Sequence, residues 1–395
     1  MKVINNLLDK NINRYSIIVV GAGLTGSVLA KELCEAGENV LVIERRNNIG
    51  GNLFDSFDAD GDYIQYYGPH CFHTNDERIV NYISKVCDWE PYKVKCSVYM
   101  KGKLTPSPFN FKTIDQYFDL NTAKLIKDNL KSYYLNKEAV SIVEMLNSNN
   151  DIVRKYAKFL FDSDYSLYTA KQWGISPSMV STDVLARVPV LLNYDEQYFY
   201  DKYQFMPKKG FNDFISNMLN CSVDVLLGHD FNSLFSVADG KIRYKGTIFN
   251  GKIIYTGPID SLFRHKYGIL PYRSLRFEYY KNKYLPCDSA IIAYPEARFF
   301  TRVTNYNELI KNKSNRGIFG KEYPLKYNPS ENEPYYPISS KANDLRFKKY
   351  VDELKKYPQI LICGRLAEYK YINMDETILN TSKFLHKHFK ISIFN

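Results

Sequence analysis

Hydrophobic positions near the N-terminus follow two different spacings, and each spacing predicts an element of secondary structure. Ile17–Val20 is an unbroken run of β-branched residues, which is typical of a buried parallel strand. From Leu24 to Ala36 the apolar residues recur at helical spacing. The segment VLVIE, which ends at Glu44, predicts a second buried strand. The chain therefore begins with a predicted strand, helix and strand.

A glycine-rich turn joins the first strand to the helix. Gly21 permits the tight turn, Gly23 removes a side chain that would block a pyrophosphate, and Gly26 lets the helix pack closely on the strand. The helix N-terminus then presents unpaired N–H groups to the phosphates. Glu44 follows Gly21 by 23 residues, the spacing at which a carboxylate accepts from both hydroxyls of an adenosine ribose. A ribose with a 2′-phosphate would be repelled there.

A second glycine pair, Gly50 and Gly51, follows in the segment ERRNNIGGN. It lets the backbone approach the cofactor again, and this favours FAD over NAD. A plain hairpin turn is the other interpretation of the pair.

The hydrophobic spacing changes again farther along the chain. From about Arg78 to Tyr168, segments such as AKLIKDNLKSYYL predict an inserted helical domain. From Val188, short strand-like segments predict an antiparallel sheet, while VDVLLGHDF and GKIIYTGPID predict strands that rejoin the nucleotide-binding domain. A last helix is predicted from near Asp375, with its N-terminus facing the cofactor.

These patterns predict an α/β fold with a discontinuous Rossmann-like FAD-binding domain, an inserted helical domain and an antiparallel β-sheet domain. The predicted boundaries are residues 15–78, 205–262 and 340–395 for the FAD-binding domain, residues 79–168 for the helical domain with a mobile substrate lid adjoining it, and residues 169–204 and 263–339 for the sheet domain that binds substrate.

Composition narrows the class of partner. The 395 residues carry a formal net charge of +10, but Lys and Arg form no long basic run. A basic pocket for an anionic small molecule explains this charge as well as a nucleic-acid surface does, and we predict no nucleic-acid partner. The seven cysteines are scattered, so we expect reduced thiols. No stretch approaches the roughly 18 apolar residues of a membrane span, and the polar first residues do not form a signal peptide. A cytoplasmic location is therefore expected.

Several collinear segments resemble the UDP-galactopyranose mutase family. They are YGPHCFHTND from Tyr67, PFNFKT from Pro108, YTAKQWGISP from Tyr168, IIYTGPID from Ile254, EYPLKY from Glu322, EPYYPI from Glu333 and GRLAEYKYINM from Gly364. With the glycine-rich turn, the resemblance runs from Tyr15 almost to the C-terminus.

The resemblance implies an isomerase that interconverts the pyranose and furanose forms of a nucleotide sugar with reduced FAD and no net redox change. In the family mechanism the flavin N(5) attacks the anomeric carbon, expels the nucleotide diphosphate and forms an iminium, and the sugar recloses through a different hydroxyl. We expect UDP-galactose as substrate, with dTDP-fucose and UDP-N-acetylgalactosamine as open alternatives. The product would be a furanose donor for cell-surface polysaccharide such as O-antigen.

The resemblance also assigns roles to residues. Arg187 and Arg302 match diphosphate-binding arginines, whose planar fork grips two phosphate oxygens, and His73 matches a histidine beside the flavin. Together these are the predicted catalytic residues. The predicted cofactor contacts are Gly21, Gly23, Gly26, Glu44, Gly50, Gly51, Asn52, His70, His73, Arg365 and Met374. The predicted substrate contacts are Phe109, Asn110, Tyr168, Trp173, Arg187, Tyr198, Arg302, Tyr336 and Tyr371. Within these sets, Tyr168 stacks on the base and Trp173 lies on the lid. No metal site is predicted, because His70 and His73 lack a third ligand.

The match is imperfect around base and sugar. Asn373 stands where the family commonly has aspartate, Leu191 replaces an arginine and Pro69 an alanine, and Asp164 and Tyr165 replace a phenylalanine pair. An FAD-dependent oxidase or dehydrogenase and a non-catalytic nucleotide-sugar binder are the alternatives of another class. A mutase of this kind needs an external reductant, such as NAD(P)H or a reductase. The prediction is also compatible with a homodimer.

Overall fold

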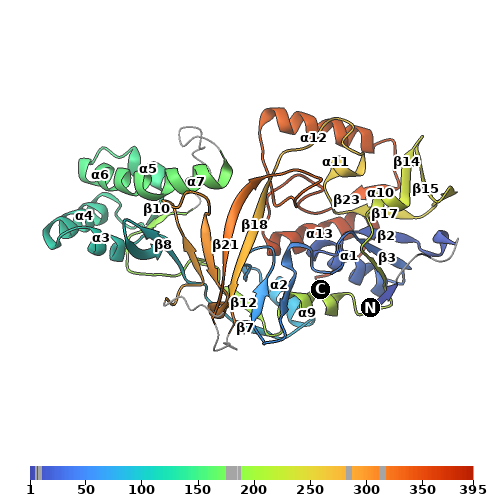
Figure 1. The fold of residues 1–395 in the computed structure, drawn as a ribbon, viewed down its shortest axis with the longest axis horizontal. Coiled ribbons are helices and arrows are strands. Elements are labelled where there is room, and N and C mark those ends of the chain that lie inside the picture. Colours follow the sequence, from blue (N-terminus) through green and yellow to red (C-terminus); the bar gives the residue numbers. More distant parts are fainter. Residues whose placement is uncertain are drawn as a thin grey trace.

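The computed structural model describes residues 1–4, 7, 11–174, 185, 188–281, 287–310 and 317–394, without the Trp173 side chain. Three parts follow one another along the long axis of the molecule (Figure 1). A parallel sheet with its helices lies at one end, a cluster of helices lies at the other, and the long strands of a second sheet lie between them. Among the described helices, none is long and apolar enough to cross a membrane.

The first part is a six-stranded parallel sheet in the order β1-β13-β3-β2-β17-β23. Its strands are β1 (Lys2–Ile4), β2 (Ile17–Val20), β3 (Val40–Glu44), β13 (Asp224–Leu227), β17 (Lys252–Tyr255) and β23 (Ile360–Ile362). Strands far apart in the sequence are therefore neighbours in this sheet. The predicted α/β fold with a discontinuous Rossmann-like domain is confirmed.

Both faces of this sheet are covered, which is why β2 and β3 are apolar at nearly every position. Ile17 and Val19 pack into a core with helices α1 (Leu24–Glu35), α9 (Phe211–Met218) and α13 (Met374–Phe389). Ile18 and Val20 face the opposite core, which is closed by a small antiparallel sheet. That sheet consists of β14 (Phe235–Ala238), β15 (Lys241–Tyr244) and β16 (Thr247–Ile248).

The second sheet has seven strands in the order β22-β18-β21-β20-β19-β8-β9. Its strands are β8 (Cys96–Met100), β9 (Lys103–Ser107), β18 (Tyr272–Lys281), β19 (Ile291–Ala293), β20 (Arg302–Asn305), β21 (Ile318–Lys326) and β22 (Tyr336–Pro337). Neighbouring strands run antiparallel except β19 and β8, so the sheet is mixed rather than purely antiparallel.

Strands β8 and β9 correct the prediction of helices from Arg78 onward. They form a hairpin whose turn residues, Lys101 and Gly102, both have positive φ (47° and 78°). Such turns match the twist of paired strands. Before them, α2 (Glu77–Ser84) and β7 (Trp89–Pro91) lie beside the parallel-sheet part, where β7 pairs with β12 (Tyr203–Pro207) and β12 pairs with β6 (Phe72–Thr74). The domain boundaries themselves stay a prediction.

The helical cluster begins after β9. Its helices are α3 (Phe111–Tyr117), α4 (Leu120–Tyr133), α5 (Ile142–Leu146), α6 (Asp151–Leu160) and α7 (Ser166–Trp173). Side chains of Asn110, Asp119, Ser141 and Asn150 accept hydrogen bonds from the first turns of α3 to α6, which explains where these four helices start. A π-helical turn, η3 (Phe161–Tyr165), joins α6 to α7. Such turns are frequent at functional sites.

Gly26→Ala is expected to destabilise the cofactor-free protein by about 2 kcal/mol, although alanine is ordinarily the better helix former. A Cβ at Gly26 would lie 1.9 Å from the backbone oxygen of Gly21, which cannot move without opening the turn. Urea unfolding measures the change. Gly23→Ala is the matched control, because its Cβ would approach nothing closer than 3.7 Å. Equal urea midpoints for the two variants would contradict the packing argument.

Candidate functional site

One cavity of about 1060 Å³ lies where the three parts meet. It opens at the carboxyl ends of β2, β3 and β17, where parallel sheets bind their ligands. From there it continues past β20 and β22 to α7 and β8. The predicted residues on its wall are Gly21, Gly23, Gly26, Glu44, Gly50, Gly51, Asn52, His70, His73, Phe109, Tyr168, Tyr198, Arg302, Tyr336, Arg365, Tyr371 and Met374.

The glycine-rich turn forms one end of the cavity. Gly21 adopts φ 110°, and a Cβ there would lie 2.2 Å from the Thr256 hydroxyl on the neighbouring β-α connection. Helix α1 has Gly23 as its N-cap, so no side chain caps its first N–H groups. These donors face the cavity and are available to an anion.

Glu44 is buried at the end of β3 and holds the turn in place. Its carboxylate accepts from the backbone N–H groups of Ala22 at 2.8 Å and of Arg46 at 2.9 Å. A carboxylate has about four lone-pair positions, so acceptor capacity remains on the cavity side. This is the geometry that a pair of ribose hydroxyls requires.

Arg46 is a cavity residue for which the sequence analysis predicted no role. Its Nη2 lies 3.0 Å from both Asn52 Oδ1 and Glu333 Oε2, and its guanidinium sits 4.0 Å from the ring centroid of Tyr67. Its Nη1 is buried and has no hydrogen-bond partner within the described part of the chain. An anchored guanidinium charge on the same cavity wall as an uncapped helix N-terminus suits a pyrophosphate. The segment ERR directly after the strand was the available signal.

The two histidines differ in their environments. His70 Nδ1 lies 2.8 Å from the Gly68 carbonyl, and burial, with the charge of Arg365, lowers the pKa of His70 to about 4. His70 is therefore neutral at physiological pH. His73 Nδ1 lies 2.9 Å from Asp201 Oδ2, and its ring stacks on Phe199 at 3.8 Å between centroids. Asp201, which the sequence analysis missed, fixes the orientation of His73.

Arg302 lies midway along the cavity on β20. Its Nε and Nη2 donate to Glu322 Oε2 at 2.8 and 2.7 Å, and Glu322 is only 2 % exposed. Burial alone would lower the pKa of Arg302, but the Glu322 carboxylate together with Tyr168 and Tyr336 holds that pKa well above its ordinary value. A guanidinium has five N–H donors, so Arg302 keeps donors for a second anion. Glu322 was quoted only as part of a motif, and its role was missed.

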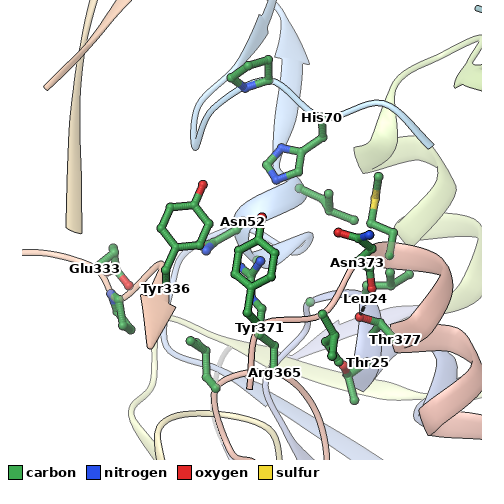
Figure 2. Close-up of a pocket in the computed structure, with 18 of the residues that line it drawn as sticks. Leu24, Thr25, Asn52, His70, Glu333, Tyr336, Arg365, Tyr371, Asn373 and Thr377 are labelled. Atoms are coloured by element: carbon green, nitrogen blue, oxygen red, sulfur yellow. Dashed lines mark hydrogen bonds between the residues drawn. The ribbon is translucent and has the colours of Figure 1, made fainter. Parts of the chain in front are cut away.

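Tyrosines line the part of the cavity that holds Arg302 and Arg365. Figure 2 shows Tyr336 and Tyr371 next to Arg365, with His70 on one side and Asn373 and Thr377 at the start of α13 on another. The rings of Tyr336 and Tyr371 lie 5.5 Å apart. On the side of α7, Tyr168 lines the cavity and interacts electrostatically with Arg302. Asp164 also lines it, with its Oδ1 buried and unpaired.

Asn110 is a correction to the predicted site. It is fully buried away from the cavity wall, where its side chain accepts from Lys112 N at 2.9 Å and donates to the Asp195 carbonyl at 2.7 Å. Both ends of its amide are therefore used in capping α3. Arg187 and the side chain of Trp173 lie outside the described residues. Among the residues that are described, His, Cys, Asp and Glu form no group of three that could hold a metal.

Comparison with known proteins agrees with this architecture. The family model for UDP-galactopyranose mutase matches residues 165–371, and the model for NAD(P)-binding Rossmann-like domains matches residues 19–86. The chain is 34% identical over 383 residues to a UDP-galactopyranose mutase of Mycoplasma genitalium, covering 94% of each. It is 29% identical to a dTDP-fucopyranose mutase of Escherichia coli, covering 92% of this chain and 95% of that one.

A solved structure of reduced UDP-galactopyranose mutase shares the fold, with a TM-score of 0.70 and 19% sequence identity over 94% of this chain and 93% of that chain. The sequence matches extend over nearly the whole chain and include the cavity-lining segments. The chain belongs to the UDP-galactopyranose mutase family and is a nucleotide-sugar pyranose/furanose mutase.

Proposed function

We propose that this chain interconverts UDP-galactopyranose and UDP-galactofuranose with a bound FAD that must be reduced before turnover. The observation that carries the proposal is the single cavity that joins the dinucleotide turn to the buried cation of Arg302. One continuous space can therefore hold a dinucleotide and the diphosphate of a second nucleotide. UDP-galactose is favoured over dTDP-fucose because the Mycoplasma mutase is the more similar of the two relatives.

The dinucleotide end of the cavity fits FAD. Glu44 would accept from the ribose hydroxyls, while the α1 N-terminus and the charge of Arg46 would stabilise the pyrophosphate. The space beside Gly23 is one that a side chain would fill. When bound and reduced, the flavin supplies a nucleophilic nitrogen for the anomeric carbon.

The chain's own residues provide positioning and charge. Arg302 remains protonated and, oriented by Glu322, holds the diphosphate as negative charge develops on it. Tyr336, Tyr371 and Tyr198 surround this point and limit the access of water to the sugar. Asp201 fixes His73 through Nδ1, so Nε2 is the ring nitrogen left to interact with the cofactor.

The test is an anaerobic incubation of the dithionite-reduced holoenzyme with UDP-galactose, dTDP-fucose and UDP-N-acetylgalactosamine in separate reactions. Ion-exchange chromatography resolves the pyranose and furanose forms. We expect conversion of UDP-galactose by the reduced enzyme and none by the oxidised enzyme. Conversion of only another sugar would overturn the substrate assignment, and conversion of none would overturn the mutase activity.

We also propose that an external reductant, NAD(P)H or a reductase, supplies the electrons and that the enzyme is a homodimer. The chain has one glycine-rich turn of the dinucleotide-binding type followed by an acidic residue. A nicotinamide would therefore bind only transiently. Anaerobic flavin reduction by NADH and NADPH tests the first point, and light scattering tests the second.

Arg302→Lys is expected to lower kcat/KM for the nucleotide sugar by about a hundredfold, because lysine keeps the charge but loses the planar fork. Lysine also leaves Glu322 with a cation, so the fold is retained. Steady-state kinetics of the reduced enzyme measures the effect. Arg276→Ala removes an exposed arginine of the same sheet that pairs with Glu278, and its kinetics should match the wild type. An unchanged kcat/KM in Arg302→Lys would remove Arg302 from the proposed site.

Gly23→Ala is expected to weaken FAD binding by about tenfold or more while the protein remains folded. The added Cβ fits against the protein, with its nearest neighbour, the Gly51 Cα, at 3.7 Å. The same Cβ enters the space assigned to the pyrophosphate. Flavin fluorescence during titration of the apoprotein with FAD measures the affinity. Wild-type affinity in this variant would mean that the pyrophosphate lies elsewhere.

A further inference from the structure

Asp164 is a buried carboxyl that the proposed mechanism does not use. It lies on the π-helical turn η3, is 9 % exposed, and lines the cavity. Its Oδ1 is buried and has no hydrogen-bond partner among the residues that the structure describes. An unpaired buried carboxyl destabilises the fold, and a turn of the Asp164 side chain toward the cavity that its other atoms line would bring both oxygens to a ligand there.

Two polar side chains near Asp164 are already engaged elsewhere. Lys171 Nζ donates to the carbonyls of Tyr294, Pro295 and Ala297 at 2.6, 3.1 and 2.7 Å, which uses the three protons of an ammonium. The Tyr165 hydroxyl donates to the Val188 carbonyl at 2.9 Å. Neither side chain has a proton left for the Asp164 carboxyl.

The protonation state follows from this burial. Desolvation raises the pKa of Asp164 to about 7, and the charge of Lys171 opposes the rise. The titratable side chains around it are Tyr165, Tyr168 and Lys171 on its own helical segment, and beyond Tyr168 lie Tyr198, Arg302 and Glu322. Below pH 7 the group is mainly a neutral acid, with one O–H donor and one carbonyl acceptor side by side.

The cavity geometry decides which part of the substrate lies here. Arg302 acts electrostatically on His70, on the side of the dinucleotide turn, and on Tyr168, on α7. A nucleotide sugar with its diphosphate at Arg302 and its sugar toward the flavin must extend its nucleoside toward α7. Asp164 precedes Tyr168 by about one helical turn, so carboxyl and ring share this end of the cavity.

We propose that the Asp164 carboxylic acid is a specificity-determining contact for the nucleobase, accepting from the N3–H of uracil or thymine and donating to the adjacent carbonyl. The proposal rests on the proposed function, which supplies the diphosphate position. A neutral acid matches an edge with one donor beside one acceptor, as these bases have. An ionised carboxylate would instead match the two adjacent donors of guanine.

The test is calorimetric titration of the oxidised holoenzyme, which cannot turn over, with UDP-galactose from pH 6 to 8.5. Wild-type affinity is expected to fall by up to about tenfold per pH unit above 7, because the acid ionises and the carboxylate repels the base carbonyl. Asp164→Asn keeps one donor and one acceptor without titrating, so its affinity should match the wild type at pH 6 and stay constant. Asp164→Val should bind about ten- to a hundredfold more weakly at pH 6.

Two controls separate this contact from general effects. Asp162→Asn changes an exposed neighbour that pairs with Lys158 and should keep the wild-type pH profile. UDP-galactose methylated at uracil N3 should lose affinity for the wild type but not for Asp164→Val. If Asp164→Val does not fold, the affinity of the wild type for the methylated ligand and the pH profile of binding by Asp164→Asn still test the contact.

The outcomes distinguish the two proposals. Equal affinities and pH profiles in wild type and Asp164→Asn, with no effect of N3 methylation, would overturn the Asp164 assignment while UDP-galactose binding stands. Tighter binding of GDP-mannose than of UDP-galactose at pH 6 would reverse the assigned protonation state. Failure of the wild type to bind UDP-galactose, dTDP-fucose or UDP-N-acetylgalactosamine would instead overturn the proposed function.

Discussion

The architecture depends on the close approach of three backbone segments at the glycine-rich turn. The Gly26 Cα hydrogen faces the Gly21 carbonyl where no side chain could fit, and Gly21 in turn lies against Thr256 after β17. This contact brings the N-terminus of α1 to the floor of the cavity and ties the start of the chain to a segment more than 200 residues later. The cavity exists because these segments meet at the same edge of the parallel sheet.

Carboxylates from distant segments hold three side chains of the cavity in place. Glu322 positions Arg302, Glu333 positions Arg46, and Asp201 positions His73. Each carboxylate uses part of the hydrogen-bonding capacity of its partner and leaves the remainder for a ligand. Because the side chains are fixed before a ligand binds, little conformational entropy is lost on binding. Asp164 is the contrasting case, a carboxyl in the same cavity whose Oδ1 has no such partner.

Much of the parallel-sheet part could be predicted because local spacing determines it. Runs of apolar residues specified β2, β3 and β17, and the glycines with Glu44 specified the turn. Hydrophobic spacing failed at β8 and β9, because their side chains pack against strands from far along the chain and because the Lys101–Gly102 turn was not recognised. Asn110 was misassigned for a related reason: a helix cap and a ligand contact use the same amide chemistry, and only its position away from the cavity separates them.

The sequence by itself determined the family and the dinucleotide turn and identified residues of the cavity wall such as Glu44 and Arg302, since these depend on residue identity at fixed spacing. Only the tertiary structure decided which charges are paired and which are free. Glu322 meets Arg302 across neighbouring strands, Glu333 reaches Arg46 from the opposite end of the chain, and Asp164 is enclosed with no partner for its Oδ1. The reason is that hydrogen bonding and desolvation depend on distances between side chains that are remote in sequence, which no local pattern records.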